Sequence, residues 1–161
     1  MNLSSLNYVD IRAVAVAMRA WDYREISATR FTPDRASLAD EIADQFSRNA
    51  KGMTAWVVSL DAPICVIGAW QSWPGMWSVF MFATDRMPEI GLPLTKFVKR
   101  SMIPSIMGCG SFNRAECKSI EGHDEAQRWL EVLGARREHT FENYGRLKET
   151  FYSYVWDQRC A

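Results

Sequence analysis

The sequence predicts a single α+β domain over residues 1–161, with helices packed on a mixed, mostly antiparallel sheet. Apolar residues recur at helical spacing in several segments, and strand-like runs lie between them. Most runs follow one another too closely for a crossover, but a helical segment separates the third strand from the fourth and permits parallel pairing there. A length of 161 residues suits one domain, and 48% hydrophobic with 24% charged residues suits a packed core.

Two helices are expected near the N-terminus, after a short strand near Leu3–Leu6. The first begins after Asp10, a good N-cap residue. Its apolar face follows the spacing i, i+3, i+4 and i+7, with Ile11, Val14, Ala15 and Met18. The polar stretch Asp22–Arg30 either continues or interrupts this helix. The second helix begins at Ser37 and ends at Gly52.

Three strand-like runs follow in quick succession: Thr54–Leu60, Ile64–Trp70 and Met76–Thr84. The turns between them are so short that neighbouring strands must be antiparallel, which predicts a meander. Three tryptophans, Trp70, Trp73 and Trp77, lie around the second turn. They either form an aromatic surface patch or fill the core.

The rest of the chain predicts two helices and three strands. A loop is expected at Asp85–Pro93 because it is rich in proline and glycine, and Pro104 is expected to kink or end the helix that follows. The second helix carries apolar residues from Ala126 to Leu133 and is closed by Gly134. Strands are expected at Phe112–Lys118, Ala135–Phe141 and Thr150–Trp156, with turn residues at 143–145. The predicted order is (β)ααβββαβαββ.

Charge and composition exclude several classes of function. Nineteen basic and nineteen acidic side chains give no net charge, so nucleic-acid binding is not expected. Four cysteines without a CxxC pair, and only two histidines, do not predict a metal site. No apolar stretch is long enough to span a membrane, and the N-terminus lacks the pattern of a signal peptide, so a cytoplasmic location is expected.

The predicted order resembles that of the GNAT acyltransferase fold. The likeness is most specific in ECKSIEGHDEAQRWLEVLGARRE, Glu116–Glu138, where a strand, a polar loop and a helix closed by a leucine-glycine turn follow one another. The stretch MRAWDYREISATR, Met18–Arg30, is similar to small GNAT-like proteins encoded by short-tailed bacteriophages, which carry a met-arg-x-x-asp-x-x-glu run after the first helix. The likeness covers nearly the whole chain in order.

The resemblance implies acetyl-CoA as cofactor and places its binding residues. Pantetheine would pair with the backbone of the fourth strand at Phe80, Met81 and Phe82, and the pyrophosphate would bind N–H groups at the start of the next helix. The family pattern there is Gln or Arg, two residues, Gly, one residue, then Gly or Ala. Arg86 and Gly91 match parts of it. Two prolines remove N–H donors from this stretch, and a glutamate brings a like charge towards a phosphate.

Three residues are candidates for catalysis. Glu116 on the fifth strand would be a general base if it faces the cleft, although a carboxylate on the solvated face of a strand is the simpler account. His123 falls where these enzymes commonly carry asparagine, and would be a titrating group or only a polar residue at a helix start. Leu130 replaces the tyrosine that usually protonates the thiolate, so Tyr144, or alternatively Ser119 or Tyr152, would be the acid in its place.

These departures favour a phage-encoded GNAT-fold protein with a degenerate acetyl-CoA site. The resemblance implies a role in virion assembly or as an internal virion or ejection-associated protein. Its partner would be a virion or host protein, and its location the cytoplasm of the infected bacterial host or the virion. The alternative is an active N-acetyltransferase that uses acetyl-CoA on a host protein or small amine.

Overall fold

The computed structural model describes residues 1–31, 34–110 and 112–157. It has the predicted α+β fold, with a seven-stranded sheet in the order β1-β2-β3-β4-β5-β7-β6. Contacts divide the chain into two compact units, the first made of Met1–Trp70 with Phe80–Leu94, and the second of Gln71–Val79 with the chain from Thr95 on. The single domain over residues 1–161 stays a prediction.

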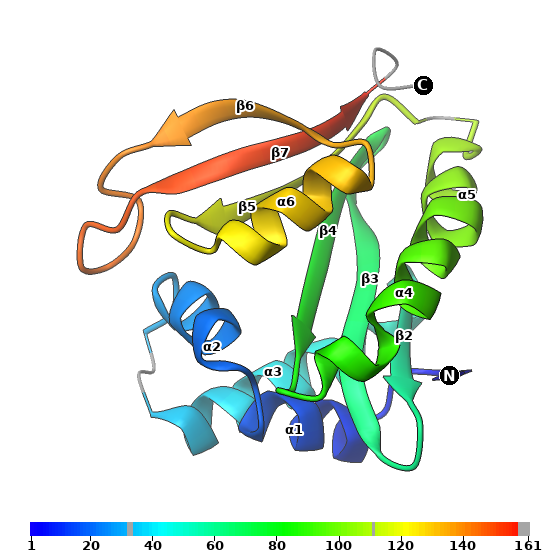
Figure 1. Cartoon of the computed structure of the whole chain (residues 1–161), viewed down its shortest axis with the longest axis vertical. Coiled ribbons are helices and arrows are strands. Elements are labelled where there is room, and N and C mark those ends of the chain that lie inside the picture. Colours follow the sequence, from blue (N-terminus) through cyan, green and yellow to red (C-terminus); the bar gives the residue numbers. More distant parts are fainter. Residues whose placement is uncertain (32–33, 111, 158–161) are drawn as a thin grey trace. The chain divides into compact units, whose positions relative to one another are not determined.

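The first unit is a meander of strands with helices (Figure 1). Its elements are β1 (Asn2–Ser4), α1 (Tyr8–Val16), α2 (Ala20–Ser27), α3 (Arg35–Asn49), the 3-10 turn η1 (Ala50–Gly52), β2 (Met53–Ser59), most of β3 (Pro63–Trp73), the end of β4 (Met76–Ala83) and most of α4 (Met87–Phe97). β1 pairs antiparallel with β2, and β2 with β3. The predicted antiparallel pairing of the first two long runs is therefore confirmed.

The core of the first unit lies where α1 and α3, side by side in Figure 1, meet the strands. Both helices bury the apolar faces that their spacing predicts. Phe46 of α3 packs edge-on against two rings of β4, with ring centroids 4.5 Å from Phe80 and 5.9 Å from Phe82. The buried cluster consists of Ile11, Val14, Ala15, Met18, Leu38, Ala39, Ile42, Ala43, Phe46, Val57, Val66 and Phe82.

The helix starts differ from those predicted. Asn7, not Asp10, is the N-cap of α1, and its side chain accepts the N–H of Asp10 at 2.9 Å. Asp34, not Ser37, is the N-cap of α3, and it accepts the N–H of Ser37 at 2.8 Å. Each predicted start is thus the third helical residue, because a side chain three positions earlier satisfies its N–H. The polar stretch after α1 forms a helix of its own, α2.

The second unit contains the β5–β7–β6 ribbon and the helix α6 (Figure 1). Its elements are the first half of β4, the end of α4, the π-helical stretch η2 (Val98–Met102), α5 (Ile103–Met107), β5 (Arg114–Ile120), α6 (Asp124–Val132), β6 (Arg136–Phe141) and β7 (Phe151–Asp157). β4 and β5 pair in parallel, as predicted, whereas β7 is antiparallel to both β5 and β6. Gly134 ends α6 with a φ of 91°, as its predicted C′ position requires.

The predicted loop at Asp85–Pro93 is wrong, because α4 begins at Met87. Pro88 is the second helical residue, where the missing N–H would have no intrahelical partner in any case. Pro104 does not end the helical stretch, because η2 and α5 continue it to Met107. Five residues of π-helix precede that proline, and the wider turn accommodates a residue that cannot donate.

Candidate functional site

The predicted pantetheine-binding residues lie at the end of β4. Phe80 and Phe82 share one face of the strand, and both rings pack against Phe46 in the core of the first unit. Met81, between them, is half-buried on the other face. Two of the three side chains are therefore core residues, and only the strand's backbone is available for the predicted pairing.

The predicted pyrophosphate ligand Arg86 is held by two carboxylates. Its Nε and one terminal nitrogen each lie 2.8 Å from an oxygen of Glu89, and that nitrogen also lies 2.7 Å from Asp61 Oδ1. The guanidinium lowers the pKa of both carboxyl groups below their ordinary values, chiefly through these hydrogen bonds. Both are therefore charged at neutral pH, and the cation that would meet a phosphate is already neutralised.

The N–H groups at the start of α4 are also engaged. Arg86 donates its N–H to Thr84 Oγ1 at 3.3 Å, and Met87 donates to the Thr84 carbonyl at 3.0 Å. Pro88 has no N–H, and Glu89 donates to the Arg86 carbonyl at 3.0 Å. Four successive residues thus offer no open donor to a phosphate. Glu89 stands at the first glycine position of the family pattern.

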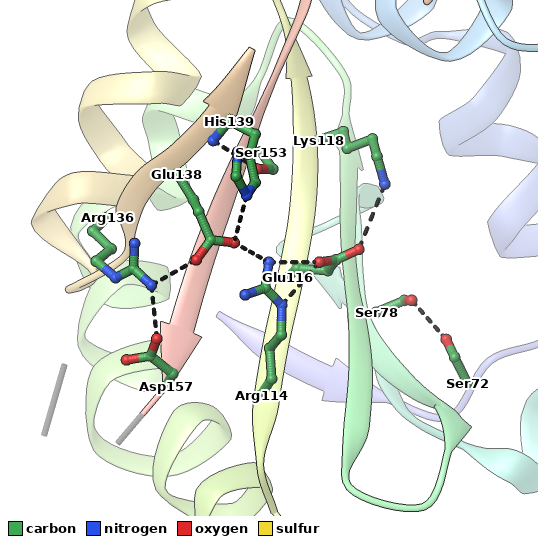
Figure 2. Close-up of polar contacts among 10 residues, drawn as sticks. All are labelled: Ser72, Ser78, Arg114, Glu116, Lys118, Arg136, Glu138, His139, Ser153 and Asp157. Atoms are coloured by element: carbon green, nitrogen blue, oxygen red, sulfur yellow. Dashed lines mark hydrogen bonds and ion pairs between the residues drawn. The ribbon is translucent and has the colours of Figure 1, made fainter. Parts of the chain in front are cut away.

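The second unit places Glu116 in a chain of alternating charges on one face of the ribbon (Figure 2). Arg114 donates to Glu116 Oε2 at 3.0 and 2.9 Å, and it also pairs with Glu138. Arg136 lies 2.7 Å from Glu138 and 2.8 Å from Asp157. A β-bulge at Glu138 turns this carboxylate towards both arginines.

The two arginines strongly lower the pKa of the central carboxylate, Glu138. Hydrogen bonds from Arg114 and Arg136 lower the pKa of Glu138 to about 2. The pKa of each arginine is raised in turn by the same contacts. A general base needs a pKa near the working pH, so Glu138 is not suited to that task. Glu116, the predicted base, is tied into the same ion pairs.

Lys118 connects two of the three predicted catalytic residues. Its Nζ lies 3.5 Å from Glu116 Oε1 and 5.7 Å from the centroid of the Tyr144 ring. Tyr144 is 44% exposed and packs against the rings of Phe141 and Phe151. Lys118 therefore links Glu116 and Tyr144 through an ion pair and a cation–π contact.

The third predicted residue, His123, is the N-cap residue of α6 and only 3% exposed. Its backbone carbonyl accepts the N–H of Gln127, as a cap residue's does. Leu130, at the tyrosine position of the family, is a buried apolar residue of the same helix. His123 thus begins α6 through its backbone, without a side-chain capping hydrogen bond, and its catalytic role stays a prediction.

Sequence reasoning missed the arginines and Lys118. Lys118 follows Glu116 by two residues, so strand alternation alone predicts that both lie on one face. The sequence left open whether the three tryptophans form a surface patch or fill the core. Trp77 is buried, Trp70 packs against Phe46, and Trp73 alone is 62% exposed, so the three do not form one surface patch.

Within residues 1–31, 34–110 and 112–157, no group of three or more histidine, cysteine, aspartate or glutamate residues is arranged to hold a metal ion. No helix in those ranges combines the length and the apolar character that crossing a bilayer requires. Cys160 lies outside the described residues.

Comparison with known proteins identifies the fold. No protein-family model matches the sequence, and no curated protein does so either. Solved structures do match. An acetyltransferase of the GNAT family from Bacillus anthracis is 14% identical, with a TM-score of 0.70 over 98% of this chain and 94% of its own.

Two further structures agree. A spermidine N-acetyltransferase, SpeG, from Vibrio cholerae is 12% identical, with a TM-score of 0.68 over 98% of this chain and 95% of its own. The protein smu.2055 from Streptococcus mutans UA159 is 16% identical, with a TM-score of 0.65 over 98% of this chain and 99% of its own. The chain therefore has the fold of the GNAT acetyltransferases. Identities this low show the fold alone.

Proposed function

We propose that this chain is a GNAT-fold protein whose acyl-CoA site is degenerate and which acts by binding another protein. The observation that carries the proposal is the neutralised Arg86. A phosphate-binding arginine must leave its donors open to the ligand, whereas this one already pairs with Glu89 and Asp61.

The start of α4 supports the same proposal. The positive end of a helix dipole attracts an anion, and a carboxylate of the chain itself meets that requirement as a phosphate would. Glu89 is in the first turn of α4. A bound pyrophosphate would have to displace this carboxylate from Arg86 and would repel it.

The second unit offers exposed side chains for a protein partner. Trp73 at the tip of the β3–β4 hairpin is 62% exposed, and Leu147 in the loop between β6 and β7 is 72% exposed. Tyr144, near Lys118, belongs to the same loop. Exposed tryptophan and tyrosine are enriched at interfaces. The resemblance to phage proteins makes a virion or host protein the first partner to test, with virion assembly or ejection as the role.

A second candidate function is N-acetyl transfer from acetyl-CoA to a protein or small amine. The fold favours it, because the similar solved structures include a spermidine N-acetyltransferase. Glu116, His123 and Tyr144 would then be the residues to test.

Isothermal titration with acetyl-CoA and free CoA separates the two functions. We expect no heat from the wild type at millimolar ligand. The double variant Asp61→Asn/Glu89→Gln frees Arg86 and is expected to gain binding. The control Glu41→Gln/Asp44→Asn makes the same change in charge on α3 and should gain none. Wild-type binding tighter than about 100 μM, roughly 5.5 kcal/mol, would contradict the proposal.

A further inference from the structure

The segment between α1 and α2 contacts the end of β4. The Arg19 N–H donates to the Ala83 carbonyl at 2.9 Å, and Asp22 Oδ2 accepts the Ala83 N–H at 2.7 Å. Met18 and Thr84 form an isolated antiparallel bridge. Both peptide groups of Ala83 are therefore satisfied by residues 18–22, which we call the clamp.

The clamp lies on the outer edge of β4. Thr84 donates its N–H to the Ile64 carbonyl of β3 at 2.8 Å. Peptide groups alternate in direction along a strand, so those of Ala83 point away from β3. This is the edge that a ligand would pair with, and the clamp occupies it one residue beyond Phe82.

The clamp is held by a buried ion pair. Asp22 is 4% exposed, and its two oxygens accept from Arg19 Nε at 3.2 Å and from a terminal nitrogen at 2.8 Å. Arg35 of α3 donates to the Met18 carbonyl at 2.8 Å. The Asp22 carboxylate thus accepts hydrogen bonds from both a guanidinium and a strand N–H. Arg19 and Asp22 are the arg-x-x-asp part of the run that resembles the phage proteins.

We propose that the clamp is an autoinhibitory contact that closes the outer edge of β4 to the pantetheine arm of acyl-CoA. It rests on the proposed function, in which the resting protein does not take the cofactor, and it adds a second closure independent of Arg86. The contact consists of one bridge and one carboxylate rather than a ladder of strand pairs. Its release therefore frees the Ala83 groups while the bond from Thr84 to Ile64 stays in place.

Amide hydrogen exchange in Asp22→Ala tests the local closure. Exchange of the Ala83 N–H is expected to quicken about tenfold or more, the change that follows loss of a hydrogen bond to a charged group. Thr84, whose N–H is bonded to β3, serves as the internal reference and should change far less. The control Asp10→Ala removes a first-turn carboxylate of α1 and should leave Ala83 unchanged. Equal exchange changes at Ala83 and Thr84, or none at either, would overturn the proposal.

An NMR titration with pantetheine tests access to the edge. Pantetheine lacks the pyrophosphate, so its binding does not depend on Arg86. The variant is expected to show shifts at Met81 and Ala83 at millimolar pantetheine that the wild type lacks. Equal shifts in both proteins would contradict the clamp, whereas wild-type binding of acetyl-CoA would contradict the proposed function and leave the exchange result standing.

Asp22→Asn keeps the test available if Asp22→Ala does not fold. An amide of the same size still accepts the Ala83 N–H but without the charge. Faster exchange at Ala83 than in the wild type, with Thr84 unchanged, supports the clamp. An Ala83 exchange rate equal to that of the wild type contradicts it.

Discussion

Arg86 in the first unit and Arg114 in the second each hold two carboxylates, yet their surroundings differ. The side chains around Arg86 are open to solvent, with Asp61 74% and Glu89 46% exposed. Those around Arg114 are largely covered, with Glu116 23% and Glu138 15% exposed. Water screens the first cluster more than the second. The second cluster is therefore expected to contribute more to the stability of the fold, whereas the first bears on the proposed loss of phosphate binding.

The comparison also separates position from function. The resemblance to the GNAT fold predicts a phosphate contact for Arg86, but Glu89 and Asp61 already pair with its guanidinium. The second cluster contains Glu116, a predicted catalytic residue, and makes it part of a structural network. Matching a residue to a motif thus predicts where it lies, and its contacts decide what it does.

The Arg19–Asp22 pair extends the comparison to a still more buried site, and it gives the largest expected effect. Asp22→Ala leaves the Arg19 guanidinium and the Ala83 N–H without their acceptor. Removing one partner of a buried ion pair typically costs about 3–5 kcal/mol. Urea denaturation should show a loss of that size in the free energy of unfolding.

An exposed pair provides the control for Asp22→Ala. Asp44 pairs with Arg48 on the surface of α3, at 47% and 75% exposure. Asp44→Ala should change the free energy of unfolding by no more than about 0.5 kcal/mol. If the two variants lose similar amounts, burial is not what distinguishes these ion pairs.

Glu138→Gln is expected to have an intermediate effect that depends on pH. The carboxylate accepts from Arg114 and Arg136, and its loss should cost about 1–2 kcal/mol near neutral pH. The pKa of Glu138 falls from the ordinary 4.5 to about 2 in the folded protein. A carboxylate whose pKa is lower in the folded than in the unfolded state stabilises the fold fully at pH values above its unfolded-state pKa. This stabilisation is lost as the pH falls through its folded-state pKa.

Urea midpoints of the wild type and Glu138→Gln should therefore converge on acidification. Their difference is expected to be constant above about pH 4.5 and to vanish near pH 2, the two pKa values that bound the window. Glu142→Gln, on the exposed loop after β6, is the control. A difference that persists unchanged at the acid end would show that the two arginines do not stabilise the ionised form of Glu138.

Patterns within one element were readable from the sequence. The spacing of Ala126, Trp129 and Leu130, with Gly134 after them, predicts α6, and the short turns predict the meander. The prolines led to a wrong prediction at the start of α4, because the effect of a proline depends on its position in the helix. Pro88 favours the prediction of a loop, although a proline in the first turn of a helix removes no intrahelical hydrogen bond.

Contacts between side chains of different elements could not be predicted from the sequence. Arg114 and Glu138 are 24 residues apart, and their pairing depends on β7 lying between β5 and β6 and on the bulge in β6. The pair of Arg86 with Glu89 did carry a signal, because the two are three residues apart. A three-residue spacing brings two side chains together only in a helix, and the sequence predicted a loop at this position.

The smallest expected effect on stability is that of removing Arg86. Arg86→Ala removes the centre of the exposed cluster, and we expect no measurable change in the urea midpoint because solvent screens all three partners. Arg114→Ala, the matching change in the covered cluster, should lower the midpoint clearly, since it leaves Glu116 and Glu138 without a shared donor. If Arg86→Ala lowers the midpoint as much as Arg114→Ala does, the Arg86 cluster is structural as well. Its two carboxylates would then be kept for the fold, and their effect on phosphate binding would be a consequence of packing at the start of α4.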